Sequence, residues 1–200
     1  MQSIFTTFAD LIRERIEAGT PTTEDSVRYT FFAALLENGV AAKDVVLEYP
    51  HPAIARAEVD TWLPSYQGVA VAIEFKYDRD PPGGKNQPRT QKAGSVFRDL
   101  RRLSLTAAET KAKSYFVYLT TAEMAIYFRN PNNGHHGLFG LRPGETTTIK
   151  NSYFEGKPNT FMATLGEKFE ATLTTVMSRS LPAGYELRIY EVQADLAGDR

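Results

Sequence analysis

The feature that most constrains the fold is a pair of strand-like segments, residues 55–63 and 69–77, separated by the turn-forming run Pro-Ser-Tyr-Gln-Gly. In the second segment, large apolar side chains alternate with alanine, glutamate and lysine. Such period-two alternation places successive side chains on opposite faces of a β-strand. We therefore expect an antiparallel hairpin whose second strand has one apolar face and one face that bears charge.

The charged face of this second strand carries two alanines, Glu74 and Lys76. A solvated strand usually carries bulkier polar residues, so the alanines indicate a face that is covered or that leaves room for a ligand. If the turn centres near Tyr66, Asp60 pairs with Ala72 and lies diagonal to Glu74 on the same face. A register that differs by one residue would send Asp60 to the opposite face. The predicted cluster therefore depends on the register.

Two neighbouring carboxylates can bind Mg²⁺ through oxygen and leave coordination positions for water and a phosphate oxygen. Lys76 could position or deprotonate an attacking water, or offset charge on the phosphate in the transition state. The structural alternative is a cross-strand ion-pair cluster on a solvated sheet face. A Glu-x-Lys triplet is common by chance, so the hypothesis of a metal site depends on the hairpin around it.

The remainder of the chain indicates helices packed on a mixed sheet. Helical spacing and capping residues predict helices at residues 4–18, 24–37, 89–105 and 160–178, the second of them capped by Thr22 or Thr23. Beyond the hairpin, strands are predicted at residues 45–49, 114–120 and 185–192. Residues 124–128 fit a short strand or the edge of a helix, and residues 130–144 fit a loop. Helices with a mixed sheet predict an α/β or α+β domain.

Charge is distributed unevenly along the chain, which has a net charge of −1. Residues 76–113 contain ten Lys/Arg and four Asp/Glu, and such a basic segment can attract a polyanion. On the helix expected there, Arg98, Arg101 and Arg102 share a face that could follow phosphates, as could Lys85, Arg89 and Lys92 before it. The alternative is a solubilising helix face, partly paired with Asp99.

Composition excludes several other classes of protein. The chain has no cysteine, which rules out disulfides and Cys-ligated zinc and fits a reducing compartment. No apolar run approaches the roughly 20 residues needed to span a bilayer, and charges interrupt the first 18 residues. We expect a cytoplasmic protein without a membrane segment or an organic cofactor. Adjacent His135 and His136 are expected to have no metal role, and Trp62 either packs beneath a helix or stacks on a base.

The order of these elements resembles the PD-(D/E)XK nuclease superfamily, whose fold is that of type II restriction endonucleases. The resemblance covers about residues 24–120: a helix with a leading acid, an Asp in a hairpin, Glu-x-Lys in the next strand, then a helix and a buried strand. It departs from the family name in that Val59, not proline, precedes Asp60. The resemblance implies that Asp60 and Glu74 bind a divalent metal and that Lys76 acts in water activation.

Three further assignments follow from the same resemblance. A backbone carbonyl such as that of Phe75 would complete the metal ligands. Glu24 matches an acid that many members use, although a first-turn acid also has a sufficient role at the helix dipole. Gln91 or Lys92 matches a Gln or Lys on the following helix of some members.

Together these features predict one α/β domain over residues 1–200, with a restriction-endonuclease-like mixed sheet flanked by helices and the core order αβββαβ. Residues 1–20 would form an N-terminal helix, residues 24–120 the catalytic core, and residues 121–200 an elaboration that completes the sheet. The predicted function is a Mg²⁺-dependent deoxyribonuclease, an endonuclease in which Mn²⁺ can replace Mg²⁺. Compact enzymes that cut duplex DNA often work as homodimers in which each subunit cuts one strand, but no dimer interface is predicted from the sequence. The alternative is a catalytically inactive nucleic-acid-binding or protein-interaction module with the same fold.

Overall fold

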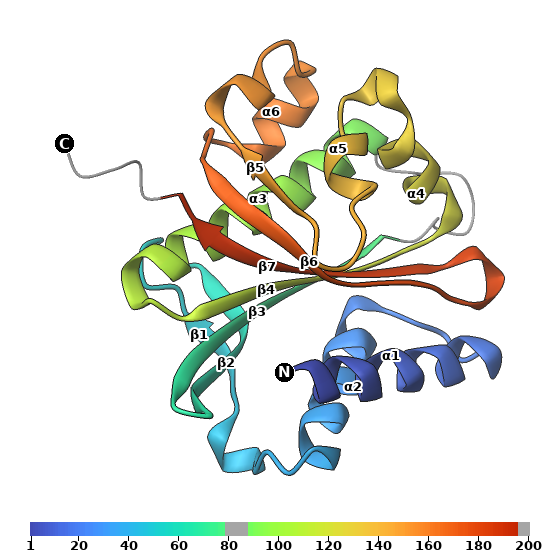
Figure 1. Cartoon of the computed structure of the whole chain (residues 1–200), viewed down its shortest axis with the longest axis vertical. Coiled ribbons are helices and arrows are strands. Elements are labelled where there is room, and N and C mark those ends of the chain that lie inside the picture. The colour runs from blue at the N-terminus through green and yellow to red at the C-terminus, as the bar shows by residue number, and fades with distance from the viewer. Residues whose placement is uncertain (79–87, 196–200) are drawn as a thin grey trace.

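A computed structural model describes residues 1–78 and 88–195, and within them helices cover both faces of a seven-stranded mixed sheet (Figure 1). The sheet order is β1-β2-β3-β4-β7-β6-β5, in which β3 and β4 are parallel and the other neighbours antiparallel. The strands are β1 (Val46–Pro50), β2 (Glu58–Tyr66), β3 (Val69–Asp78), β4 (Lys113–Thr120), β5 (Thr146–Ile149), β6 (Ala171–Ser180) and β7 (Glu186–Ala194).

The helices are α1 (Gln2–Glu17), α2 (Glu24–Glu37), α3 (Arg89–Thr110), α4 (Ala122–Arg129), α5 (His136–Phe139) and α6 (Asn159–Leu165). Short 3₁₀ turns lie at Ala42–Asp44, Pro131–Asn133, Asn151–Phe154 and Pro182–Gly184. Helices α1 and α2 cover one face of the sheet, and α3 to α6 lie on the other (Figure 1). None of the described helices is both long and apolar enough to cross a membrane. The expected mixed sheet flanked by helices is confirmed.

The sheet separates two hydrophobic cores, and β3 contributes to both. Its odd-numbered residues, such as Ile73 and Phe75, pack with Phe31 and the other apolar side chains of α1 and α2. Its even-numbered Ala72 packs beneath α3, in a core that contains Phe97. The alanines are small because α3 covers this face closely, which confirms that the charged face of the strand is covered.

The hairpin register differs from the expected one by two residues. Gln67 and Gly68 form the turn, with φ angles of 53° and 81°, so the turn is not centred near Tyr66. Positive φ at both central residues is the conformation that two-residue hairpins favour. Thr61 pairs with Ile73, which aligns Asp60 with Glu74 instead of with Ala72. Because the shift is an even number, Asp60 stays on the predicted face.

An irregularity in β2 determines that face. The register changes by one residue between Leu63 and Tyr66, where Pro64 has no N–H to donate to a neighbouring strand. A β-bulge adds one residue to one strand and so changes which face the residues beyond it occupy. Without this bulge, the register set by the turn would place Asp60 opposite Phe75, on the α1–α2 side. The bulge therefore brings Asp60 to the face of Glu74.

Several expected elements are corrected by the structure. Residues 160–178 are not one helix, since α6 ends at Leu165 and β6 begins at Ala171. Residues 124–128 belong to α4, and residues 130–144 contain a 3₁₀ turn and α5 in place of a continuous loop. Residues 55–57 precede β2, α3 continues to Thr110, and β5 was not anticipated. Thr23, not Thr22, caps α2: its Oγ1 accepts from the N–H of Ser26, whose Oγ accepts from the N–H of Thr23.

Candidate active site

The predicted site residues meet where β2 separates from β3. The last β2–β3 pair towards this end is Thr61 with Ile73. Beyond it, the N–H of Phe75 donates to Asp60 Oδ2 at 2.8 Å, and the N–H of Tyr77 donates to Glu24 Oε2 at 3.0 Å. Side-chain carboxylates thus accept the N–H groups of β3 that no strand pairs with here. These hydrogen bonds hold both acids at the strand edge.

Lys76 is held in its charged form at the same edge. Its Nζ donates to Glu24 Oε2 at 3.0 Å, so one carboxylate oxygen accepts from both Lys76 and the N–H of Tyr77. Burial alone would lower the pKa of Lys76, but the nearby carboxylates of Glu24 and Asp99 raise it above its usual value. An ammonium group with a raised pKa is a proton donor and a positive charge rather than a general base.

Asp60 and Glu74 form a carboxyl pair in which Glu74 is buried and Asp60 is half-buried. The Glu74 residue is 2% exposed. Burial raises the pKa of Asp60, and burial together with the Asp60 charge raises the pKa of Glu74 well above its usual value. Two like charges forced together in this way favour a shared proton or a bound cation.

An arginine approaches each member of the pair. A guanidinium nitrogen of Arg28 lies 3.0 Å from Asp60 Oδ1, and one of Arg102 lies 3.0 Å from Glu74 Oε1. The second contact does not have hydrogen-bond geometry, so the buried Glu74 Oε1 has no hydrogen-bond partner among the described residues. The guanidinium thus supplies a positive charge to this oxygen but no hydrogen bond, which leaves part of the cost of burying it uncompensated.

Sequence reasoning assigned no site role to Arg28 or Asp99. Asp99, on α3, is 4% exposed, and burial raises its pKa to about 6. Guanidinium nitrogens of Arg98 and Arg102 lie 3.7 and 3.8 Å from it. A sequence signal existed, because Arg28 is four residues after Glu24 and Asp99 three before Arg102, spacings that share a helix face.

The donor set fits a divalent cation of the Mg²⁺ type. Asp60 and Glu74 offer hard oxygen ligands, and the carbonyl of Phe75 points to the same strand edge as its N–H, which bonds to Asp60. Among the described residues, no group of three or more His, Cys, Asp or Glu side chains is arranged to hold a metal. Mg²⁺ commonly uses only one or two carboxylates and keeps several waters. The carboxyl pair therefore suits such an ion.

The residues expected to contact DNA are mostly engaged within the protein. Arg101 pairs with Glu167, and Arg89 pairs with Glu123. Lys92 is buried, and Gln91 is half-buried. Arg102 lies in the acidic cluster and also donates to the carbonyl oxygen of Glu58. Lys85 lies outside the described residues.

Among the described members of this set, Arg98 and Arg89 keep the largest exposed fractions, with side chains 48% and 54% exposed. The structure thus separates Arg102, which lies beside the carboxyl pair, from a more exposed pair of arginines along α3.

Trp62 and His135 have packing roles. Trp62 stacks on Tyr49, with ring centroids 4.7 Å apart, within the core beneath α3. His135 is buried beside Phe97 and Phe128, its Nδ1 lies 2.6 Å from Tyr153 Oη, and burial lowers its pKa to about 3. The choice left open for Trp62 is therefore settled in favour of packing.

Comparison of this chain with protein-family models, with curated proteins and with solved structures gives no match. Inferences about its function accordingly rest on the residues and the geometry described above.

Proposed function

We propose that this chain is a divalent-metal-dependent deoxyribonuclease of the PD-(D/E)XK kind, an endonuclease that hydrolyses phosphodiester bonds. The observation that carries the proposal is the meeting of Glu24, Asp60, Glu74 and Lys76, from α2, β2 and β3, at one strand edge. The succession of α2, three strands, α3 and β4 supports a restriction-endonuclease-like core.

In this mechanism Asp60, Glu74 and the carbonyl of Phe75 would hold Mg²⁺ or Mn²⁺. The ion, when bound, supplies Lewis-acid activation of water and neutralises negative charge on the phosphate. The negative charge of the two carboxylates would favour binding of the cation. Burial also strengthens every charge interaction at this edge, because the local dielectric constant is lower than that of water.

Lys76 contributes a proton donor that is already oriented. Glu24 fixes its Nζ and, with Asp99, keeps it protonated. We therefore assign Lys76 to orienting the attacking water or stabilising charge on the phosphate, in preference to deprotonating the water. Arg102 lies beside Glu74 and offers a planar guanidinium suited to phosphate oxygens.

One observation favours a second function, that of an inactive module that binds nucleic acid or protein. Each carboxyl of the pair already has a guanidinium 3.0 Å away, Arg28 for Asp60 and Arg102 for Glu74. In a protein without turnover, these ion pairs would be the permanent state of the site. The two functions are distinguished by whether a divalent metal allows the protein to cleave DNA.

Cleavage assays test the proposal. The wild-type protein is incubated with plasmid, linear duplex DNA, single-stranded DNA and RNA, in Mg²⁺, in Mn²⁺ and in chelator. We expect metal-dependent cleavage of DNA that falls by about 100-fold or more in Asp60→Asn, Glu74→Gln and Lys76→Ala, as for loss of a group that stabilises the transition state.

Asp10→Asn is the matched control, because Asp10 is an exposed carboxylate that pairs with Arg179 away from this edge. The control should keep full activity. Cleavage that survives all three site substitutions would reveal a contaminating nuclease and contradict the proposal. Wild-type protein that binds DNA but cleaves none of the substrates in either metal would favour the inactive module.

A further inference from the structure

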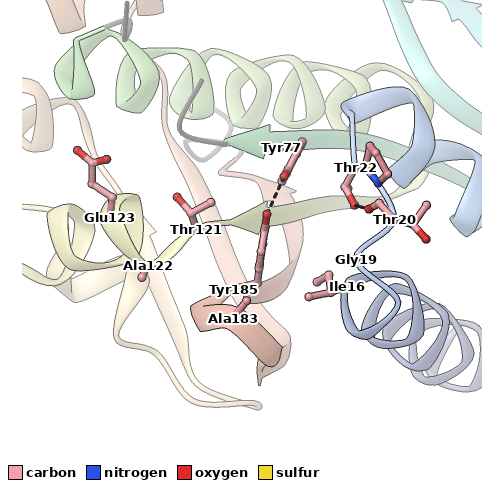
Figure 2. Close-up of a pocket in the computed structure, with 11 residues that line it drawn as sticks. Ile16, Gly19, Thr20, Thr22, Tyr77, Thr121, Ala122, Glu123, Ala183 and Tyr185 are labelled. Atoms are coloured by element: carbon pink, nitrogen blue, oxygen red, sulfur yellow. Dashed lines mark hydrogen bonds between the residues drawn. The ribbon is translucent and has the colours of Figure 1, made fainter. Parts of the chain in front are cut away.

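A recess lies beside the proposed active site, at the carboxyl ends of the parallel strands β3 and β4. It has a volume of about 640 Å³, and its wall includes Tyr77 near the end of β3 and Thr121 directly after β4 (Figure 2). Ligands of open α/β sheets commonly bind outside the carboxyl ends of such strands. The volume also falls within the range of about 300–1,000 Å³ that is typical of small-molecule sites.

Two tyrosines whose hydroxyl groups contact each other form part of the wall of this recess. The hydroxyl groups of Tyr77 and Tyr185 lie 3.3 Å apart, and their rings are inclined by only 19°, with centroids 6.4 Å apart. Figure 2 shows this pair between Thr20 and Thr22 on one side and Thr121 on the other. The wall therefore offers aromatic rings together with hydroxyl groups that can donate or accept hydrogen bonds.

The recess is poor in charge. Among the described residues that line it, Glu123 alone is charged, and Arg89 already pairs with that carboxylate. None of these described residues is a lysine or arginine, so they offer no cation for a phosphate group. Aromatic rings and hydroxyl groups without cations suit a neutral, flat heterocycle with polar edges, which is the chemistry of a nucleobase.

The recess and the proposed active site share a wall. The N–H of Tyr77 donates to Glu24 Oε2, the oxygen that also accepts from Lys76 Nζ. Thr22 also lines the recess and lies two residues before Glu24. Tyr77 and Thr22 therefore both adjoin Glu24, the residue that holds Lys76. A nucleotide carries a phosphate at one end and a base at the other. The proposed active site could take the phosphate, and the adjoining recess could take the base.

We propose that this recess binds the unpaired base of a nucleotide whose phosphate lies at the proposed active site, with Tyr77 and Tyr185 providing the aromatic wall. The inference rests on the proposed nuclease function and adds a substrate class to it, DNA with a single-stranded or unpaired nucleotide next to the bond that is cut. In an intact duplex the base is stacked and paired, and it must leave the stack before a pocket can receive it.

Binding of oligonucleotides that carry the fluorescent base 2-aminopurine tests this inference. The base is placed either in a single-stranded end or inside a full duplex, and binding is measured in chelator and in Ca²⁺. We expect quenching and tight binding for the unpaired base only. Tyr185→Ala should weaken that binding by about 5- to 150-fold, the range for loss of one base–aromatic stack. Tyr185→Phe, which keeps the ring, should retain most of it.

Two further variants keep the test independent of folding. Tyr29→Ala is the matched control, because it removes a tyrosine that is 65% exposed on α2 and does not line the recess. Ala122→Leu adds volume at an exposed position of the recess and should weaken binding of the unpaired base even if Tyr185→Ala does not fold.

Several results would overturn the inference: wild-type protein that does not bind the unpaired base, equal losses for paired and unpaired bases, or wild-type binding by both Tyr185→Ala and Ala122→Leu. Glu74-dependent DNA cleavage with no effect of Tyr185 would reject the base site and leave the nuclease intact. Tyr185-dependent binding without any metal-dependent cleavage would reject the nuclease and leave a site for unpaired bases.

Discussion

The two faces of β3 differ in the chemistry of the side chains that they bury. One face buries Val71, Ile73 and Phe75 against α1 and α2, where apolar contact is the only requirement. The other face buries Ala72 beneath α3 and then presents Glu74 and Lys76, two charged residues within a covered environment. The first face stabilises the fold, whereas the second carries charge that must be balanced by other elements.

The two faces therefore differ in what burial costs. Burying a charge is costly unless it is paired and hydrogen-bonded, and replacing a buried ion pair with apolar residues is often neutral or stabilising. The charged face nevertheless collects a further acid from each of α2, β2 and α3, namely Glu24, Asp60 and Asp99. A strand optimised for stability alone would not need such a cluster.

The largest expected effect separates the two faces directly. Phe75→Ala should lower the free energy of unfolding by about 3–5 kcal/mol, because it removes a fully buried ring from the apolar face. Glu74→Gln, one residue away, should leave stability unchanged or increase it at pH 8 in chelator, since burial disfavours its charged form. Denaturant unfolding measures both. A loss in Glu74→Gln as large as that in Phe75→Ala would show that the charged face is structural.

A smaller effect concerns pH and the charged face. The pKa of Asp99 is raised from 3.8 to about 6, so the folded state keeps a proton that the unfolded chain releases between these values. Stability should therefore fall as pH rises from about 4 to about 6, by up to about 3 kcal/mol from Asp99. Asp99→Asn should remove this part of the pH dependence in urea unfolding. Parallel wild-type and variant curves would contradict the assignment.

The smallest expected effect concerns the cap of α2, the helix that packs on the apolar face of the sheet and carries Glu24. Thr23 caps this helix, and the next residue, Glu24, fixes Lys76. Thr23→Ala should cost about 1 kcal/mol of stability, as for loss of a side-chain cap. If the cap also positions Glu24, cleavage should fall further than in a surface variant of equal stability. If the surface variant lost the same amount of activity, the Thr23 cap would affect stability only and would not position Glu24.

The sequence predicted this part of the fold because its signals are local. Alternation in β3 and the threonine cap of α2, predicted at Thr22 or Thr23, each depend on a few neighbouring residues. The register was harder to predict, because the turn lies at Gln67–Gly68 and the bulge near Pro64 offsets it by one residue. The displaced turn and the bulge together change the register by two residues, so Asp60 stays on the expected face but is aligned with Glu74 and not with Ala72.

The C-terminal part was predicted less well for a physical reason. Residues 160–178 contain apolar residues at spacings that fit a helix, but Gly166 has a φ of 87° and ends α6. Beyond it, Ala171–Ser180 alternates buried and half-buried residues, as a strand between β5 and β7 requires. The threonines of that segment were the signal, since β-branched residues favour strands.

Ion pairing explains what the sequence could not show of the site. Spacing predicted that Asp60, Glu74 and Lys76 share a face, and the resemblance added Glu24. Arg28 and Arg102, however, approach the carboxyl pair from separate helices. Such contacts depend on how α2 and α3 pack on the sheet, which no local pattern determines.

Calorimetric titration with Mn²⁺ at pH 8 tests the central claim, that the charged face of β3 is a metal site. We predict that wild-type protein binds the ion and that saturation at about 100 times Kd adds about 2.7 kcal/mol of stability. Binding should be lost in Asp60→Asn and in Glu74→Gln and kept in Asp10→Asn. Wild-type protein that binds no Mn²⁺, or binding that survives both site substitutions, would contradict the claim.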